Sequence, residues 1–468
     1  MAKQPKKSFQ SSKLAKKQRQ SLLTLLILVS LSKITWLWNQ PNHLLLGSDG
    51  ENYFSGLEGL VKDGLFSEAG NLHYWPSGYP ILMWPLAELS TTYFPFFVGA
   101  LQILFYSFAT YYFAIQLQGS NFGKIFWPAV LIITFNPILA LNASAIGYEV
   151  NAAASFLIAL GAFFKFSNRQ DKSLGNPEIW YSALALALAT FMQPRISVLA
   201  FSLFLIWALA SFKRLVALLM IISTSVVVAL GPLFMIGRNV VANDFVAIST
   251  NLGTTMNIGA GPQSTGGYTN QATGVPCTPI EGNPAVQDSH KVGCVLSWYK
   301  ENPGLGVGLF LRKFTFHFSP WFGPLANGTT ARSPWLDIHP FKSTVQSQEG
   351  FNMVYGNSGK LVSWGWLIGS FALMIWGFIA LWRLKGQAQV LAALLLAPSL
   401  LNALSSLITI GDNRFRMPTM TLSILLQLFG AYALLSKKSF KRWASLDAKS
   451  SWPGLNWKKK AEIDNLPS

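Results

Sequence analysis

Acidic residues are scarce in this chain, so the carboxylates that follow its first apolar run stand out. Asp49 and Glu51 lie two residues apart there, in a chain of 468 residues with only 19 Asp and Glu. A carboxylate beside a bound substrate can take the proton of an attacking hydroxyl. Positions two apart on a helix point about 200° away from each other, so we expect Asp49 to be the catalytic group and Glu51 a secondary one. The alternative role for Asp49 is to cap the next helix.

A third carboxylate, Glu149, stands where another apolar run begins. With Asp49 it could form a catalytic pair or hold a divalent cation through carboxylate oxygens; the alternative is a residue of a solvated loop. The five histidines and two cysteines form no recognisable zinc pattern. The sequence therefore implies no certain cofactor and leaves a divalent cation open.

Cationic side chains near the ends of other apolar runs suit a phosphate group. The guanidinium is planar, always charged and able to bind two oxygens at once. The candidates for binding a donor phosphate are Arg195, Arg238, Arg414, Arg416 and Lys33. Lys33 lies inside an apolar run, where a charge is costly unless it is paired or near the headgroups. Each arginine could instead anchor the chain at a membrane interface.

The elements that would position these residues are membrane helices. The chain is 51% hydrophobic and 12% charged, whereas soluble domains carry about 25% charged residues. Several apolar runs approach or exceed the roughly 18 residues that cross a bilayer. This predicts an all-α polytopic membrane protein. The expected spans are 21–39, 93–116, 125–141, 149–166, 179–193, 196–212, 215–236, 361–382, 387–409 and 418–435.

The net charge of +17 is gathered at the two ends of the chain. Basic residues beside membrane spans stay on the cytoplasmic side and can touch anionic lipid, so we expect membrane lipid as a partner. No base-reading motif accompanies the charge, which argues against nucleic acid. The expected organisation is a basic cytoplasmic tail 1–20, an N-terminal membrane module 21–237 with a first outer loop 40–91, an extracytoplasmic segment 238–360 with an interfacial or re-entrant helix 304–321, C-terminal membrane helices 361–436 and a basic cytoplasmic tail 437–468.

This topology brings distant acids and arginines to one face of the membrane. A carboxylate next to arginines suits sugar transfer from a lipid-phosphate donor, because the reaction needs a base for the acceptor and a clamp on the departing phosphate. A transporter or a lipid-linked saccharide flippase is the alternative. Such a protein normally has ionisable groups or broken helices near the bilayer midplane, whereas here the spans are nearly free of acids.

The two cysteines, Cys277 and Cys294, fall in the same polar segment. If this segment faces an oxidising compartment, a disulfide between them is plausible. Two free thiols are the alternative.

Four stretches, in chain order, resemble the membrane glycosyltransferases of the GT-C fold, and most closely the bacterial branch of the protein O-mannosyltransferase and aminoarabinose-transferase families. They are Asp49 with Tyr53 and then Pro76-Ser77-Gly78-Tyr79-Pro80; Asn136-Pro137 with Tyr148-Glu149; Arg238-Asn239 with Thr265-Gly266-Gly267-Tyr268; and Arg414-Phe415-Arg416-Met417-Pro418. One departure matters, because many relatives have adjacent Asp and Glu, whereas Gly50 separates Asp49 from Glu51 here.

The resemblance implies a bundle of about 10–12 transmembrane helices in a bacterial inner membrane, both termini cytoplasmic and the active site outside. It implies a hexosyl- or pentosyltransferase that uses a polyprenyl-phosphate sugar donor, with Asp49 as catalytic acid or base. The acceptor would be a glycan, a lipid or a protein of the cell envelope. By the same resemblance, the substrate-binding residues would be Tyr53, Tyr79, Asn239 and Tyr268.

Overall fold

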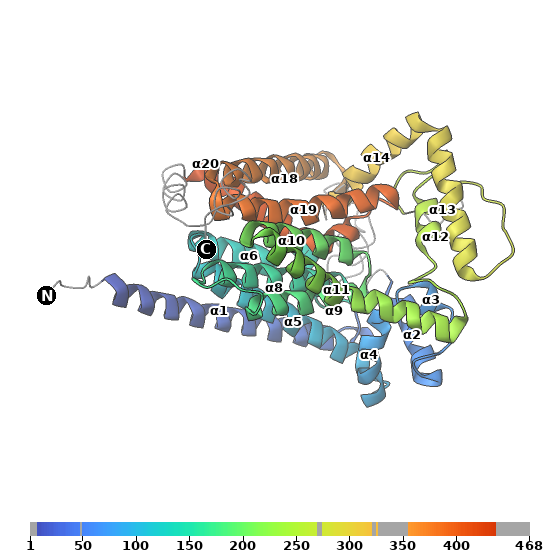
Figure 1. Cartoon of the computed structure of the whole chain (residues 1–468), viewed down its shortest axis with the longest axis horizontal. Coiled ribbons are helices and arrows are strands. Elements are labelled where there is room, and N and C mark those ends of the chain that lie inside the picture. The colour runs from blue at the N-terminus through green and yellow to red at the C-terminus, as the bar shows by residue number, and fades with distance from the viewer. Residues whose placement is uncertain (1–6, 47–48, 269–273, 321–323, 326–353, 437–468) are drawn as a thin grey trace.

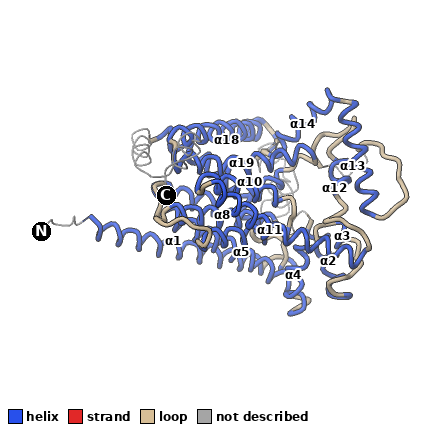
Figure 2. The backbone as a smooth tube through the Cα atoms, viewed as in Figure 1, coloured by secondary structure: helices blue, strands red, loops and turns tan. Residues whose placement is uncertain are grey.

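The computed structural model describes residues 7–46, 49–268, 274–320, 324–325 and 354–436. Within these ranges the chain is helical and contains no strand, and helices joined by loops fill Figure 2. The predicted all-α membrane architecture is therefore confirmed. The predicted C-terminal tail 437–468 and residues 326–353 of the outer segment lie outside the described residues.

Seven helices in the described residues are long and apolar enough to cross a membrane. They are α1 (Lys7–Trp38, apolar over Lys16–Trp38), α5 (Phe94–Gln118), α8 (Glu149–Ser167), α11 (Arg214–Asn243), α18 (Asn357–Leu384), α19 (Gly386–Ile408) and the segment Asn413–Leu435, which comprises η3 (Asn413–Arg416) and α20 (Met417–Leu435). The other three predicted spans form shorter helices, α6 (Phe126–Phe135), α9 (Pro177–Met192) and α10 (Ile196–Ser211).

Proline explains why these three helices are short. Pro137 ends α6 because its ring disfavours helical backbone at Asn136, and α7 (Pro137–Asn142) begins there with the Asn136 side chain as its cap. Pro194 separates α9 from α10 in the same way. Each break places polar backbone and a polar side chain at the end of an apolar helix.

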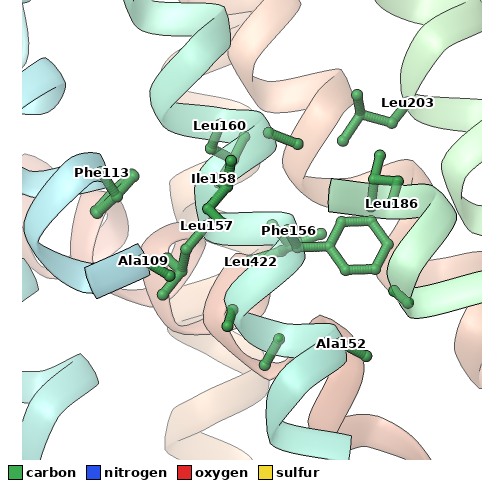
Figure 3. Close-up of a cluster of buried hydrophobic side chains, with 14 of the residues drawn as sticks. Ala109, Phe113, Ala152, Phe156, Leu157, Ile158, Leu160, Leu186, Leu203 and Leu422 are labelled. Atoms are coloured by element: carbon green, nitrogen blue, oxygen red, sulfur yellow. The ribbon is translucent and has the colours of Figure 1, made fainter. Parts of the chain in front are cut away.

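The core is built around α8, which is enclosed by other helices over most of its length. Figure 3 shows Phe156 and Leu157 of α8 among apolar side chains from α5, α9, α10 and α20, including Ala109, Leu186 and Leu422. Burial of such side chains contributes about 1.5–3 kcal/mol each relative to exposure in water. The first residue of α8, Glu149, is thereby held in place by the most enclosed helix of the bundle.

The remaining helices gather at one end of the bundle, opposite the first residues of α1 (Figure 1). They are α2 (Gly50–Asp63), α3 (Asn71–Tyr74), α4 (Gly78–Leu89), α12 (Leu252–Ile258), α13 (Pro284–Glu301) and α14 (Pro303–His317). The helices α2 and α4 lie in the segment 40–91 that was predicted as the first outer loop, and α14 lies where an interfacial or re-entrant helix was expected. The loops that carry the candidate residues thus meet at this end.

Candidate functional site

A short backbone contact aligns the two main carboxylates. Leu46 and Ile146 form an isolated parallel bridge, and the Ile146 amide donates to the Leu45 carbonyl at 3.0 Å. Asp49 and Glu149 each stand three residues after this bridge. Asp49 is the N-cap residue of α2 and Glu149 is the first residue of α8, so both carboxylates lie at positively polarised helix ends. Equal spacing from one bridge brings the two acids together.

Arg414 lies between these two carboxylates. Its Nη1 donates to Asp49 Oδ2 at 2.6 Å, and its Nε lies 3.5 Å from Glu149 Oε1. All three side chains are about nine-tenths buried. The Asp49 side chain makes no capping hydrogen bond, so the alternative role of Asp49 as a helix cap is not the one seen here. We refer to Asp49, Glu149 and Arg414 as the acid end of the site.

The turn η3 that carries Arg414 is fixed from three sides. The Asp412 carboxylate accepts from the Arg414 amide at 2.8 Å. The Gly411 amide donates to the Gly266 carbonyl at 2.8 Å, and a Cβ at Gly411 would lie 2.5 Å from the Lys313 Cα. Only glycine allows the turn to approach α14 so closely. The Asn402 amide of α19 adds a 2.5 Å hydrogen bond to the Phe415 carbonyl.

Two tyrosines predicted to bind substrate enclose the acid end. The Tyr79 hydroxyl donates to Gln102 Oε1 at 2.8 Å and accepts from the Gly147 amide at 2.8 Å, so it holds the segment that leads into Glu149. The Tyr53 ring stands edge-on to the Tyr79 ring with centroids 4.9 Å apart. Burial raises the pKa of Tyr53 well above its usual value, and the nearby Asp49 and Glu149 charges raise it further. Tyr53 therefore stays protonated beside the carboxylates.

A second group of side chains, next to the acid end, contains cations without carboxylate partners. Arg195, in the turn between α9 and α10, donates to the Tyr148 hydroxyl at 3.0 Å and lies over the Phe415 ring, 4.0 Å from its centroid. Arg416 lies 5.8 Å from the centroid of the Phe318 ring. The Nε atoms of both arginines are buried without a hydrogen-bond partner. Neither guanidinium pairs with an acid among the residues that the structure describes.

His317 belongs to this second group, and the sequence did not predict it. It is the last residue of α14, fully buried, and its Nδ1 lies 2.9 Å from the Ser406 hydroxyl of α19. Its Nε2 is buried without a partner. Burial lowers the pKa of His317 well below its usual value, and the charges of Arg416 and Arg195 lower it further. We refer to Arg195, Arg416 and His317 as the cationic end.

Arg238 and Asn239 serve a different contact. The Arg238 guanidinium, buried in α11, donates to the carbonyls of Leu65, Ser67 and Leu72 in the first outer loop. Its Nη1 also donates to Asn239 Oδ1 at 2.8 Å, while Asn239 Nδ2 donates to the Ala247 carbonyl at 2.9 Å. These donors are occupied by backbone acceptors. The structure therefore does not place Arg238 with the other arginines that were predicted to bind the donor phosphate.

Three more predicted residues lie away from both ends. Glu51 is exposed in the first turn of α2. Lys33 of α1 lies over the Tyr106 ring, 6.0 Å from its centroid. Tyr268 is 49% exposed in the outer segment. None has a contact with the acid end or the cationic end in the described structure.

Cys277 and Cys294 are both free thiols in the structure. They share a small apolar cluster with Met256 and Val295. Burial, with a smaller effect of the neighbouring Cys294, raises the pKa of Cys277 to about 11. The disulfide stays a prediction.

The described residues contain no group of three or more His, Cys, Asp or Glu side chains placed to hold a metal ion. The two carboxylates of the acid end contact Arg414 instead. Within its described residues, the chain therefore supplies a buried acid–arginine cluster next to two arginines and a histidine that have no acid partner.

Comparisons with known proteins add one structural likeness. No family model matches the chain, and no curated protein does. A solved structure to which it is similar is the archaeal oligosaccharyltransferase AglB from Archaeoglobus fulgidus, in complex with an inhibitory peptide and a dolichol-phosphate, with 13% identity and a TM-score of 0.47. The match covers 96% of this chain and 54% of AglB, so the chain spans about half the length of that protein.

Proposed function

We propose that this multi-pass membrane protein is a glycosyltransferase that moves a sugar from a polyprenyl-phosphate-linked donor to an acceptor hydroxyl. The observation that carries the proposal is the juxtaposition of the acid end and the cationic end. Arg195 joins them, because it donates to the hydroxyl of Tyr148, the neighbour of Glu149, and lies over the ring of Phe415, the residue between Arg414 and Arg416. A base for the acceptor and a clamp for an anionic leaving group are the two tools that such a transfer needs.

The chain's own residues can be given balanced roles. Asp49 accepts the proton of the acceptor hydroxyl as its oxygen bonds to the anomeric carbon. The bond from that carbon to the phosphate oxygen breaks, and the lipid phosphate leaves with one more negative charge than it had in the donor. Arg195 and Arg416 stabilise this added charge, whereas Arg414 orients Asp49. Groups already aimed at a developing charge need no reorganisation in the transition state.

The finer features of the proposal follow from the order of motifs and the charge of the tails. Both termini would be cytoplasmic and the site extracytoplasmic, in a bacterial inner membrane. The sugar would be a hexose or pentose, as in the O-mannosyltransferase and aminoarabinose-transferase families of GT-C fold. The acceptor would be a glycan, lipid or protein of the cell envelope.

The test is to incubate purified protein with a panel of polyprenyl-phosphate sugars and acceptors and to measure free polyprenyl phosphate. Asp49→Asn should reduce transfer by about 10²–10⁴-fold, while Arg414 keeps Glu149 as a partner and the fold is retained. The matched control is Glu58→Gln, an exposed residue two turns along α2, which should act as wild type. Glu51→Gln should also retain most of the activity.

Two results would contradict the assignment. Near-normal turnover by Asp49→Asn would remove Asp49 as the base. Movement of the lipid-linked sugar across a proteoliposome membrane, with no release of lipid phosphate for any donor, would instead favour a flippase.

A further inference from the structure

The charge balance of the cationic end is unusual for a buried site. Arg416 and His317 are more than nine-tenths buried, and Arg195 is half-buried. Among the described residues, three buried nitrogens, Nε of each arginine and Nε2 of the histidine, have no hydrogen-bond partner, as is also true of Arg414 Nε at the acid end. Leaving a buried donor or acceptor unpaired destabilises the fold, and more so when the group is charged. Two of these nitrogens belong to guanidinium cations, for which an anion is the preferred partner.

The hydrogen bonds of His317 suggest which ring nitrogen carries its proton. The Ser406 hydroxyl lies 3.4 Å from the Asn402 carbonyl, which can only accept, and 2.9 Å from His317 Nδ1. If Ser406 donates to this carbonyl, His317 Nδ1–H donates to Ser406, and Nε2 keeps a lone pair. The charged groups that face the ring from other elements are Arg416 of η3 and Arg195 of the α9–α10 turn. A lone pair directed toward these cations is favoured over a proton there.

We propose that Arg195, Arg416 and His317 form a pocket for a lipid phosphate monoester bound as its dianion, and that His317 takes up one proton when this anion binds. Two guanidinium charges match the two charges of a monoester. Once the dianion is seated, the field at Nε2 changes sign, and an imidazolium donating to a phosphate oxygen becomes the favoured form. This inference deepens the proposed function. Only the isoprenoid tail of the ligand depends on that function; the phosphate pocket does not.

The charge preference distinguishes the two sides of the proposed reaction. A sugar-linked lipid phosphate is a diester with one negative charge, whereas the released lipid phosphate is a monoester with close to two at neutral pH. The pocket therefore binds the leaving group more tightly than the donor from which it came. Tighter binding of the charge that develops during transfer is how such a pocket accelerates the chemical step.

The experiment measures binding alone, without acceptor or turnover. Isothermal titration calorimetry of the full-length protein in detergent uses geranylgeranyl phosphate, its methyl diester and inorganic phosphate as probes. The monoester should bind at least tenfold more tightly than the diester, and titrations in two buffers of different ionisation enthalpy should show close to one proton taken up. Equal affinity for monoester and diester, or the absence of proton uptake by the wild type, would overturn the inference without any variant.

Variants assign the proton to His317. His317→Gln keeps a polar side chain that cannot titrate, so it should lose the proton uptake. It should also flatten the fall in affinity between pH 6.5 and 8.5, which approaches about 100-fold in the wild type if close to one proton is taken up throughout. His290→Gln, an exposed histidine on α13 whose Nε2 lies 3.0 Å from the Thr278 carbonyl, is the matched control. Unchanged proton uptake in His317→Gln would contradict the role of His317.

Two further arms separate this inference from the proposed function. Asp49→Asn should bind the monoester as the wild type does, because the pocket does not include the base. Phosphatidic acid presents a phosphate monoester on a glycerolipid: if it binds as tightly as the isoprenyl monoester, the pocket stands and the isoprenoid donor of the proposed function loses support. Monoester binding together with no transfer would likewise contradict the glycosyltransferase and leave the pocket intact.

Discussion

The two ends of the site use arginines from the same turn in opposite ways. At the acid end, Arg414 contacts Asp49 at 2.6 Å and Glu149 at 3.5 Å. At the cationic end, Arg416, two residues later, has an aromatic ring as its neighbour and no acid among the described residues. Arg414 has its counter-charge in the protein, whereas Arg416 has none among the described residues.

This difference indicates which end is stable in the ligand-free protein and which end would be stabilised by a ligand. A buried ion pair holds its members in place, and breaking it by removing one partner costs about 3–5 kcal/mol. A buried cation without a partner does the reverse, because it destabilises the folded state until an anion arrives. The acid end is therefore preorganised, whereas the cationic end would gain stability from the anion proposed above.

The largest effect is expected at the acid end, from Arg414→Met. The change leaves Asp49 and Glu149 facing each other without a cation, so it should lower the free energy of unfolding by about 3–5 kcal/mol and reduce transfer at least 100-fold. Thermal unfolding in detergent and the lipid-phosphate release assay measure the two effects. Adding Glu149→Gln to Arg414→Met should recover part of the stability, and a double variant no more stable than the single one would contradict the ion-pair account.

The opposite change in the free energy of unfolding is expected for Arg416→Met. Removing a buried, unpaired cation should raise the free energy of unfolding of the ligand-free protein by about 1–2 kcal/mol while the KM for the donor rises about tenfold. The same measurements test this. A loss of stability in Arg416→Met would show that the two ends do not differ in the way described.

Arg238→Met is the matched control for Arg416→Met. It also removes a buried guanidinium, but one that donates to three backbone carbonyls and Asn239. It should therefore destabilise the protein and leave donor affinity unchanged in the fraction that remains folded. If its only effect is on the donor KM, Arg238 belongs to the phosphate site after all.

The smallest effect concerns Lys313, one turn before His317. Its Nζ turns away from the cationic end, to the Tyr299 hydroxyl at 2.9 Å and the Leu407 carbonyl at 3.0 Å. Burial lowers the pKa of Lys313 from 10.5 to about 7. Between these values the unfolded chain holds a proton that the folded chain releases, so stability should rise with pH, by at most about 1.4 kcal/mol per unit.

Thermal unfolding between pH 7 and 9 checks the effect of Lys313 against Lys313→Met. The variant should lack this rise in stability and keep the donor KM of the wild type. A changed donor KM would extend the cationic end to include Lys313.

Much of the helical fold could be predicted from the sequence. Apolar runs long enough to span a membrane reveal helices directly, so α5, α8, α11 and α18 lie close to their expected positions. Placing the loops of Asp49, Glu149 and Arg414 on one face of the membrane predicted that they lie near one another, but Arg414 was expected to bind phosphate and not to pair with the two acids. Side of the membrane is a coarse property that charge patterns encode.

Contacts among the loops around the acid end and the cationic end could not be predicted in the same way. The partner of an arginine, whether a carboxylate or a carbonyl, depends on how the loops pack, and loop packing produces no periodic pattern in the sequence. Arg238 and Arg416 both stand near the end of an apolar run, so the sequence does not distinguish their roles. Asp49 and Glu149 each follow by three residues a partner of the bridge between Leu46 and Ile146. The spacing can be read from the sequence, but the sequence does not show that Leu46 and Ile146 pair. His317 was missed because one histidine at the end of an apolar helix has no motif around it.

The turn η3 has a mechanical consequence. Residues two apart in a 3₁₀ turn point to different sides, about 120° apart, so a single turn delivers Arg414 to one end and Arg416 to the other. The turn is braced by Asp412, Gly411 and Asn402. In the proposed transfer, a rotation of this turn that moves Arg416 away from the leaving phosphate also moves Arg414 away from Asp49, so product release and resetting of the base are coupled.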